Sequence, residues 1–199
     1  LAAFVTPVWG GPAGCRPVFV PTSDAGRGTG KSTFVEMVGA VYNGALQFSH
    51  NEDFATIKTR LLSPDALTKR VALQDNVKTH NYSWGEFEGL VTAHTIGGKR
   101  MYVGEASRPN TITWFITLNG ASLSTDMAQR SIIIKVDKPE RSGTWEEETR
   151  QFIETNRKKI IADCVAILRE PIEHKLDQFS RWATWERDIL QRFPDCNEI

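Results

Sequence analysis

The sequence predicts an α/β fold built on a parallel sheet and followed by a helical C-terminal segment. Short runs of β-branched and aromatic residues alternate with longer amphipathic runs as far as residue 138 of the 199-residue chain. A glycine-rich turn stands between the first strand-like run and the first helix-like run. From Pro139 onward the pattern is helical. Because strands that alternate with helices are joined by crossovers, we expect them to lie parallel in one sheet.

The expected elements follow from the period of the apolar positions and from the residues that start and stop each run. The expected strands are 17–21, 44–48, 71–75, 111–118 and 131–136. The expected helices are 32–42, 52–62, 64–69, 83–93, 126–129, 145–169 and 180–192. Ser63 before Pro64 marks a capped helix start, because the serine accepts a backbone N–H and proline fits the first helical position. A hairpin is expected from 95–96 and 101–103, with Gly97-Gly98-Lys99-Arg100 as its turn.

Composition is that of an ordinary globular protein. Hydrophobic residues make up 40% and charged residues 24%, and the 24 basic side chains equal the 24 acidic ones. A chain without net charge has no global attraction for nucleic acid or for a membrane surface, so any such binding requires a local patch. No apolar run reaches about 18 residues and no basic-then-apolar leader is present, so we expect neither a membrane span nor a signal peptide.

The organisation of the chain is expected to be a leading segment over 1–16, a core over 17–138 and a helical segment over 139–199. The tryptophans of the last segment are expected to pack in a core rather than to serve a function. Three distant cysteines without a Cys-x-x-Cys pair indicate reduced thiols and a cytoplasmic protein. Since the chain begins at Leu1 rather than at Met, we expect it to be a piece of a longer protein.

A phosphate-binding loop is the most informative stretch of the chain. Residues 25–32 read Ala-Gly-Arg-Gly-Thr-Gly-Lys-Ser, with alanine where glycine is more usual, between an apolar strand and a helix. The glycines let successive N–H groups point at phosphate oxygens, and the helix N-terminus adds partial positive charge. Lys31 is expected to reach the β- and γ-phosphates, and Ser32 to ligate Mg²⁺. The expected nucleotide-binding residues are Ala25, Gly26, Arg27, Gly28, Thr29, Gly30, Lys31, Ser32 and Thr33.

Asp75 is the expected metal-side carboxylate. It ends a predicted strand, and ligands gather at the carboxyl ends of strands in sheets of this kind. A carboxylate there holds Mg²⁺ through water beside the γ-phosphate. The next residue is Asn76, and an amide cannot accept a proton from the attacking water. Either hydrolysis is slow, or Glu86, Glu88 or Glu105 takes that role.

Two further residues complete the expected site. Asn119 follows the strongest predicted strand, and its amide can bridge the γ-phosphate and the nucleophilic water because it both donates and accepts. An ordinary Asn-Gly turn is the alternative. Arg130 lies between a short helix and a strand, where it can be offered to the γ-phosphate on a neighbouring subunit. An ordinary surface arginine is the alternative there.

Lys31, Asp75, Asn119 and Arg130, in this order, resemble the motifs of superfamily 3 helicases, the AAA+-type ATPases of small viruses, phages and plasmids. The stretches Leu-Gln-Asp-Asn-Val-Lys, Trp-Phe-Ile-Thr-Leu-Asn-Gly and Asp-Met-Ala-Gln-Arg are similar to the ATPase part of phage-type primase–helicases and plasmid replication proteins. The resemblance covers residues 17–136, and Asn76 departs from the acidic pair common in that family. It implies a P-loop NTPase core of the AAA+ type.

The resemblance also implies cofactors and partners. These are ATP and Mg²⁺, a ring that is usually a hexamer, and single-stranded DNA on which the ring moves. The hairpin between the Asp75 and Asn119 strands carries the basic DNA-contacting tip in such helicases, which maps here to Lys99 and Arg100. Further replication domains are expected on the full-length protein.

Two other functions remain open from the sequence. One is a nucleotide-gated ring or switch ATPase that unwinds nothing, which suits Asn76 and the absence of net charge. The other is a small-molecule P-loop kinase, since the same loop serves such enzymes, although they have no need of Asn119 and Arg130. DNA-stimulated hydrolysis separates a motor from a switch, and assembly with ATP separates a ring from a kinase.

Overall fold

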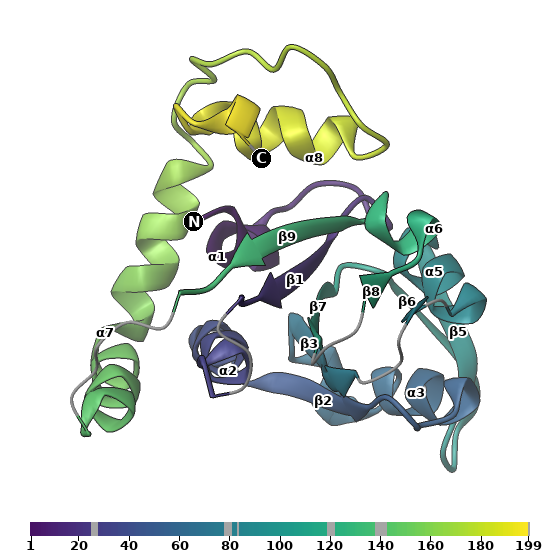
Figure 1. Ribbon diagram of the computed structural model, residues 1–199. Coiled ribbons are helices and arrows are strands. Elements are labelled where there is room, and N and C mark those ends of the chain that lie inside the picture. Colours follow the sequence, from purple (N-terminus) through teal and green to yellow (C-terminus); the bar gives the residue numbers. More distant parts are fainter. Residues whose placement is uncertain (25–27, 78–80, 83, 119–121, 138–142, 199) are drawn as a thin grey trace.

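A five-stranded parallel sheet forms the centre of the computed structural model, which describes residues 1–24, 28–77, 81–82, 84–118, 122–137 and 143–198 (Figure 1). The strand order is β2-β3-β7-β1-β9. These strands span Val18–Thr22 (β1), Ala45–Ser49 (β2), Val71–Val77 (β3), Thr113–Leu118 (β7) and Ser131–Lys135 (β9). The predicted α/β class, with a P-loop NTPase type of parallel sheet and a helical C-terminal segment, is confirmed.

Two smaller sheets accompany the main one. β4 (Asn81–Tyr82) pairs parallel with β8 (Ser122–Leu123), and β5 (Thr95–Arg100) pairs antiparallel with β6 (Gly104–Pro109). The β5–β6 pair is the predicted hairpin, but the predicted turn is wrong. Gly97, Gly98, Lys99 and Arg100 are strand residues, and Met101, Tyr102 and Val103 form the tip.

The helices lie between the strands and after them. They span Ala2–Val5 (α1), Lys31–Val41 (α2), Phe54–Leu61 (α3), Pro64–Leu67 (α4), Gly85–Thr92 (α5), Thr125–Ala128 (α6), Trp145–Ile167 (α7) and Ala183–Asp188 (α8). Short 3₁₀ turns cover Thr6–Val8, Leu190–Arg192 and Cys196–Glu198. The helix expected over 180–192 is therefore shorter than predicted and gives way to a 3₁₀ turn after Asp188. No helix in the described ranges is long and apolar enough to cross a membrane.

Side-chain caps explain where several of these helices begin. Asp53, Ser63 and Ser124 each accept the N–H of the residue three positions later, at the starts of α3, α4 and α6. Pro64 occupies the first position of α4, where its missing N–H removes no helical hydrogen bond. The predicted cap at Ser63 is confirmed.

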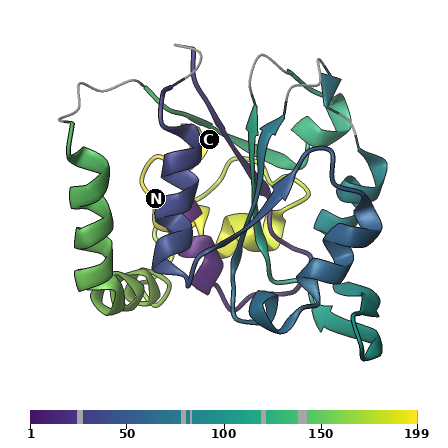
Figure 2. The same cartoon turned by 90° about the horizontal axis from the view of Figure 1, so that it is seen from below.

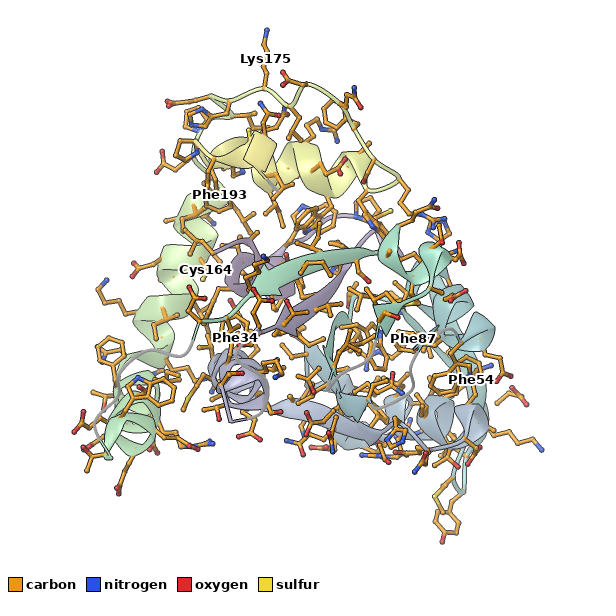
Figure 3. The ribbon with its side chains drawn as sticks, in the orientation of Figure 1. Phe34, Phe54, Phe87, Cys164, Lys175 and Phe193 are labelled. Atoms are coloured by element: carbon orange, nitrogen blue, oxygen red, sulfur yellow. The ribbon has the colours of Figure 1, made fainter. Side chains whose placement is uncertain are left out.

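The core lies on both faces of the sheet because helices cover both. β7 lies between β3 and β1, and all six of its residues are buried. Trp114 packs with Phe87 of α5 on one face, with ring centres 4.9 Å apart. Phe115 packs on the other face with Phe19 and with Phe34 of α2. Figure 3 labels Phe34 and Phe87, which approach the sheet from these two helices.

The two ends of the chain pack against each other beside β9. Trp185 of α8 is fully buried, and its indole N–H donates to the Thr6 hydroxyl at 3.0 Å. The Trp9 indole N–H donates to the Asp188 carboxylate at 3.3 Å. Trp182 is also buried, so the expectation that these C-terminal tryptophans serve packing is confirmed for Trp182 and Trp185. Figure 1 shows α8 on the same side of the sheet as α1.

Candidate nucleotide-binding site

The phosphate-loop residues lie between β1 and α2. Gly28 and Gly30 have φ angles of 74° and 84°, a left-handed conformation that glycine adopts without steric cost. Lys31 begins α2 and is buried, and its ammonium group donates to the Thr29 hydroxyl at 3.3 Å. Ser32 and Thr33 follow, half-buried, in the first turn of α2. Ala25, Gly26 and Arg27 lie outside the described residues.

The N-terminus of α2 is electrostatically suited to an anion. Its own first turn contains no acidic residue, so no side chain of that turn neutralises the positive end of the helix dipole. The first N–H groups of a helix have no partner within it and are free to bind phosphate oxygens. A buried lysine at the same end adds a full positive charge. The strand, loop and helix together provide the elements of a polyphosphate site.

Asp75 joins this loop to the centre of the sheet. The Ser32 hydroxyl donates to Oδ1 of Asp75 at 2.7 Å, across 43 positions of sequence. The Thr117 hydroxyl donates to the same oxygen at 2.5 Å. Ser32, Asp75 and Thr117 come from α2, β3 and β7, so three elements converge on one carboxylate.

The donor set at this point fits Mg²⁺. The metal prefers oxygen ligands and is usually held by one or two protein groups together with phosphates and water. The Ser32 hydroxyl and the Asp75 carboxylate are such oxygens and are already in contact. Among the described residues no cluster of three or more His, Cys, Asp or Glu side chains forms a metal cage.

A β-bulge sets the backbone around Asp75. Gln74 lies opposite Ile116 and Val77 opposite Leu118, so two residues of β3 face the single residue Thr117 of β7. Asn76, the second bulge residue, has a φ of 58° and donates its backbone N–H to the Thr117 hydroxyl at 2.8 Å. Asparagine tolerates the left-handed region better than most residues that carry a side chain. The backbone conformation at this position therefore favours asparagine over most other residues with a side chain.

The three glutamates considered as alternative bases occupy different surroundings. Glu86 is exposed on α5 and accepts from the Trp84 indole at 3.3 Å. Glu88 is buried on the same helix and accepts from the Ser124 hydroxyl at 3.5 Å. Glu105 is exposed on β6, in the hairpin, and pairs in register with Lys99.

The hairpin extends from the end of the sheet at which strands β3 and β7 begin. The Thr113 N–H that starts β7 donates to the carbonyl of Arg70, the residue before β3, and the Asn110 N–H after β6 donates to the His94 carbonyl. Figure 2 shows the teal hairpin on the side of the molecule away from the ends of β1, β3 and β7. Glu105, on β6 of this hairpin, therefore lies away from the Asp75 of its own chain.

The described positions of Lys99 and Arg100 differ from those predicted. Lys99 is exposed and lies directly opposite Glu105, whereas Arg100 is half-buried and lies opposite Gly104. Adjacent strand residues face opposite sides, so the two basic side chains do not project together from one tip. The tip is apolar, with Met101 and Val103 exposed and Tyr102 100% exposed at a φ of 62°.

Arg130 lies at the opposite end of β1 and β9 from the phosphate loop. Its carbonyl accepts the Val18 N–H, where these strands begin. The five residues of β1 span about 16 Å. The Arg130 side chain is only 13% exposed and forms an ion pair with the Asp126 carboxylate. The arginine holds the pKa of Asp126 below its usual value. Asn119 lies outside the described residues.

Sequence reasoning missed Thr117. The signal was present, because Thr117 is a polar residue near the end of a strand whose preceding residues, Trp114-Phe115-Ile116, are apolar. Its contact with Asp75 joins positions 42 apart, and no local pattern identifies such a partner.

The fold and the loop define a P-loop NTPase type of α/β protein. No family model matches the sequence, and no curated protein matches it. Among solved structures, the chain is similar to the C-terminal region of NrS-1 in its A-form apo structure. That match has 15% identity and a TM-score of 0.56, and it covers 83% of this chain and 40% of that one.

Two other solved structures match with lower identity and a lower TM-score. Residues 305–718 of the NrS-1 C-terminal region match with 14% identity and a TM-score of 0.53, over 80% of this chain and 38% of that one. JCV helicase with a bound acetamide compound matches with 10% identity and a TM-score of 0.48, over 96% and 58%. The chain thus spans less than two thirds of each of these solved chains, and the NrS-1 matches show the fold alone.

Proposed function

We propose that this chain is the ATP- and Mg²⁺-dependent motor domain of a DNA helicase or translocase from a phage- or plasmid-type replication protein. The observation that carries the nucleotide site is the 2.7 Å hydrogen bond between Ser32 and Asp75. It brings the expected metal ligand of the phosphate loop into contact with the carboxylate at the end of the neighbouring strand. The parallel-sheet fold and the order of the motif residues support the proposal of a helicase or translocase motor.

In this proposal each residue of the site has one task. The helix α2 N-terminus and Lys31 hold the β- and γ-phosphates, and Ser32 and Asp75 hold Mg²⁺. The bound metal neutralises charge that develops on the transferred phosphoryl group. Asn119 orients the attacking water. Arg130 acts from a neighbouring subunit in a ring, most simply a hexamer, because strand β1 separates it from the nucleotide of its own chain.

Single-stranded DNA is proposed to contact the β5–β6 hairpin. Lys99 is exposed there and is available to a phosphate, whereas Arg100 is half-buried. The exposed tip residues Met101, Tyr102 and Val103 offer apolar and aromatic surface instead. A protein that binds single strands without sequence preference uses both kinds of contact, charge for the backbone and aromatic rings for the bases.

A second function is favoured by one observation. Asn76 occupies a bulge position whose backbone suits an amide, and an amide does not activate water. A ring that binds ATP and hydrolyses it slowly, as a switch or an assembly scaffold, is consistent with that residue.

A comparison of ATP turnover with and without single-stranded DNA tests the proposal. We expect Mg²⁺-dependent hydrolysis that DNA stimulates, and we expect Lys31→Ala to abolish tight Mg²⁺–ATP binding because it removes the buried ammonium from the loop. Calorimetric titration of both proteins with ATP measures the second effect. Unchanged ATP affinity in Lys31→Ala would remove the loop from the nucleotide site. Hydrolysis that DNA does not stimulate would favour the switch.

A further inference from the structure

Thr117 occupies an unusual place beside the expected metal site. It is 2% exposed, near the end of the central strand β7, and its hydroxyl has a partner on each side. It donates to the Asp75 carboxylate at 2.5 Å and accepts the backbone N–H of Asn76 at 2.8 Å. One hydroxyl therefore joins both residues of the β3 bulge to β7.

These two bonds use the one donor of the Thr117 hydroxyl and one of its two acceptor positions. A hydroxyl offers one donor and two acceptor positions, whereas valine, of the same shape, offers neither. Without the hydroxyl, the Asn76 N–H loses its partner in the bulge and Asp75 keeps only Ser32 as a hydroxyl donor among the described residues. An Asp75 side chain that is held from one side only has more freedom to rotate.

We propose that Thr117 is a positioning residue for the metal–nucleotide site, which fixes the Asp75 carboxylate and the bulge that carries it. Both hydroxyl donors bind the same oxygen, Oδ1. Among the described residues no hydrogen bond to Oδ2 is present, so this oxygen remains available to a water ligand of Mg²⁺. Thr117 touches neither nucleotide nor metal in this arrangement and acts through Asp75. The inference rests on the proposed nucleotide function of the site.

The chain supplies a matched control on the same strand. Thr113 begins β7, is fully buried, and its hydroxyl has no hydrogen-bond partner within the described part of the chain. Thr113→Val and Thr117→Val are the same chemical change in the same strand, but only the second removes a contact with Asp75. Thr117→Ser keeps the hydroxyl and serves as the rescue variant.

The test measures the affinity of a fluorescent ATP analogue as Mg²⁺ is titrated, with unliganded stability recorded by chemical denaturation. Loss of a group that orients a metal ligand typically weakens metal binding about 10–100-fold. We expect Thr117→Val to raise the half-saturating Mg²⁺ concentration by a factor in that range and to leave the affinity without Mg²⁺ unchanged. Thr117→Ser and Thr113→Val are expected to behave as the parent. Turnover of Thr117→Val should approach that of the parent at saturating Mg²⁺, which a general loss of structure would not allow.

The outcomes separate this inference from the proposed function. A parent that binds no Mg²⁺–nucleotide would overturn both. A parent that binds it, with Thr117→Val showing the same Mg²⁺ dependence, would overturn the role of Thr117 alone. If Thr117→Val does not fold, Thr117→Ala, which removes the hydroxyl without adding volume, is measured in the same way. A loss of Mg²⁺ affinity in Thr117→Ser would also contradict the inference, because that variant retains the hydroxyl.

Discussion

The residue whose conformation most constrains its identity is Asn76. It follows Asp75 in a bulge, has a φ of 58° and donates its N–H to Thr117. In that region a residue with a longer side chain is strained by on the order of 1–2 kcal/mol, whereas glycine is not and asparagine adopts it more often. The left-handed backbone conformation at position 76 therefore favours asparagine, and the same amide cannot accept a proton from an attacking water.

Substitutions at Asn76 test this backbone preference. We expect Asn76→Gly to stay nearest to the parent in free energy of unfolding, and Asn76→Ala and Asn76→Glu to lose about 1 kcal/mol more. Denaturant unfolding without nucleotide measures these differences, since no ligand then masks the backbone term. Equal stability of the glycine and glutamate variants would show that the left-handed conformation places no demand on this position.

At the scale of single elements, the hairpin connects structure to the proposed DNA contact. The tip carries the fully exposed Tyr102, and Lys99 lies three residues before it on β5. A phosphate contact and a base contact respond differently to salt. Counterion release gives a slope for each neutralised phosphate, whereas stacking gives affinity that salt scarcely changes.

Two single replacements separate these contacts. Lys99→Ala should weaken single-stranded DNA binding and lower its salt slope by roughly 0.7, the contribution of one phosphate on a single strand. Tyr102→Ala should weaken binding by about 1–3 kcal/mol and leave the slope unchanged, because it removes a stacking surface. Fluorescence anisotropy at several salt concentrations gives both quantities.

The control for this pair is Lys158→Ala, which removes an exposed lysine from α7, far along the chain from the hairpin. It should leave affinity and slope unaltered. If neither hairpin replacement changes affinity or slope, DNA does not bind at the hairpin and the helicase proposal loses its support beyond the nucleotide site.

The hairpin also shows which parts of the fold local pattern could predict. The alternation of strands and helices, the cap at Ser63 and the glycine-rich loop between β1 and α2 depend on local pattern, so the sequence alone could predict them. The pair Gly97-Gly98 predicts a turn, because two adjacent glycines between strand-like runs usually form one. In the structure α3 packs over this part of β5, and a Cβ on Gly98 would lie 3.4 Å from Lys58 Cε. That distance is an ordinary van der Waals contact with a flexible side chain, and a Cβ on Gly97 would meet nothing within 4 Å, so these glycines are strand residues that neither form a turn nor are required by the packing.

Contacts between distant positions could not be predicted in this way. Thr117 meets Asp75 across 42 positions, and Trp185 meets Thr6 across 179. Each depends on the order of strands in the sheet or on the path of the chain ends. Single-sequence periodicity reports which face is apolar, but it does not report which element covers that face.

At the scale of the whole molecule, the position of Arg130 bears on whether ATP hydrolysis needs one subunit or two. It directly precedes β9 at the end of the sheet away from the phosphate loop, and its side chain, which is 13% exposed, forms an ion pair with Asp126. A role in hydrolysis therefore requires a second subunit, and it requires the arginine to exchange Asp126 for a phosphate. A structural role requires only the ion pair. Loss of Asp126 should therefore impair a structural role, whereas only loss of Arg130 should impair a role in hydrolysis.

We expect Arg130→Ala to lower ATP turnover far more than ATP affinity, since an arginine offered by a neighbour contributes on the order of 10³–10⁵ in rate. Asp126→Asn, which breaks the same ion pair but leaves the arginine in place, should retain turnover. Mixing Arg130→Ala with Lys31→Ala subunits should restore part of the activity. The Arg130→Ala subunit keeps an intact phosphate loop, and the neighbouring Lys31→Ala subunit supplies the arginine. Steady-state hydrolysis over a range of mixing ratios measures this recovery. Absence of recovery at every ratio, with Asp126→Asn as inactive as Arg130→Ala, would assign Arg130 to the structure of its own chain.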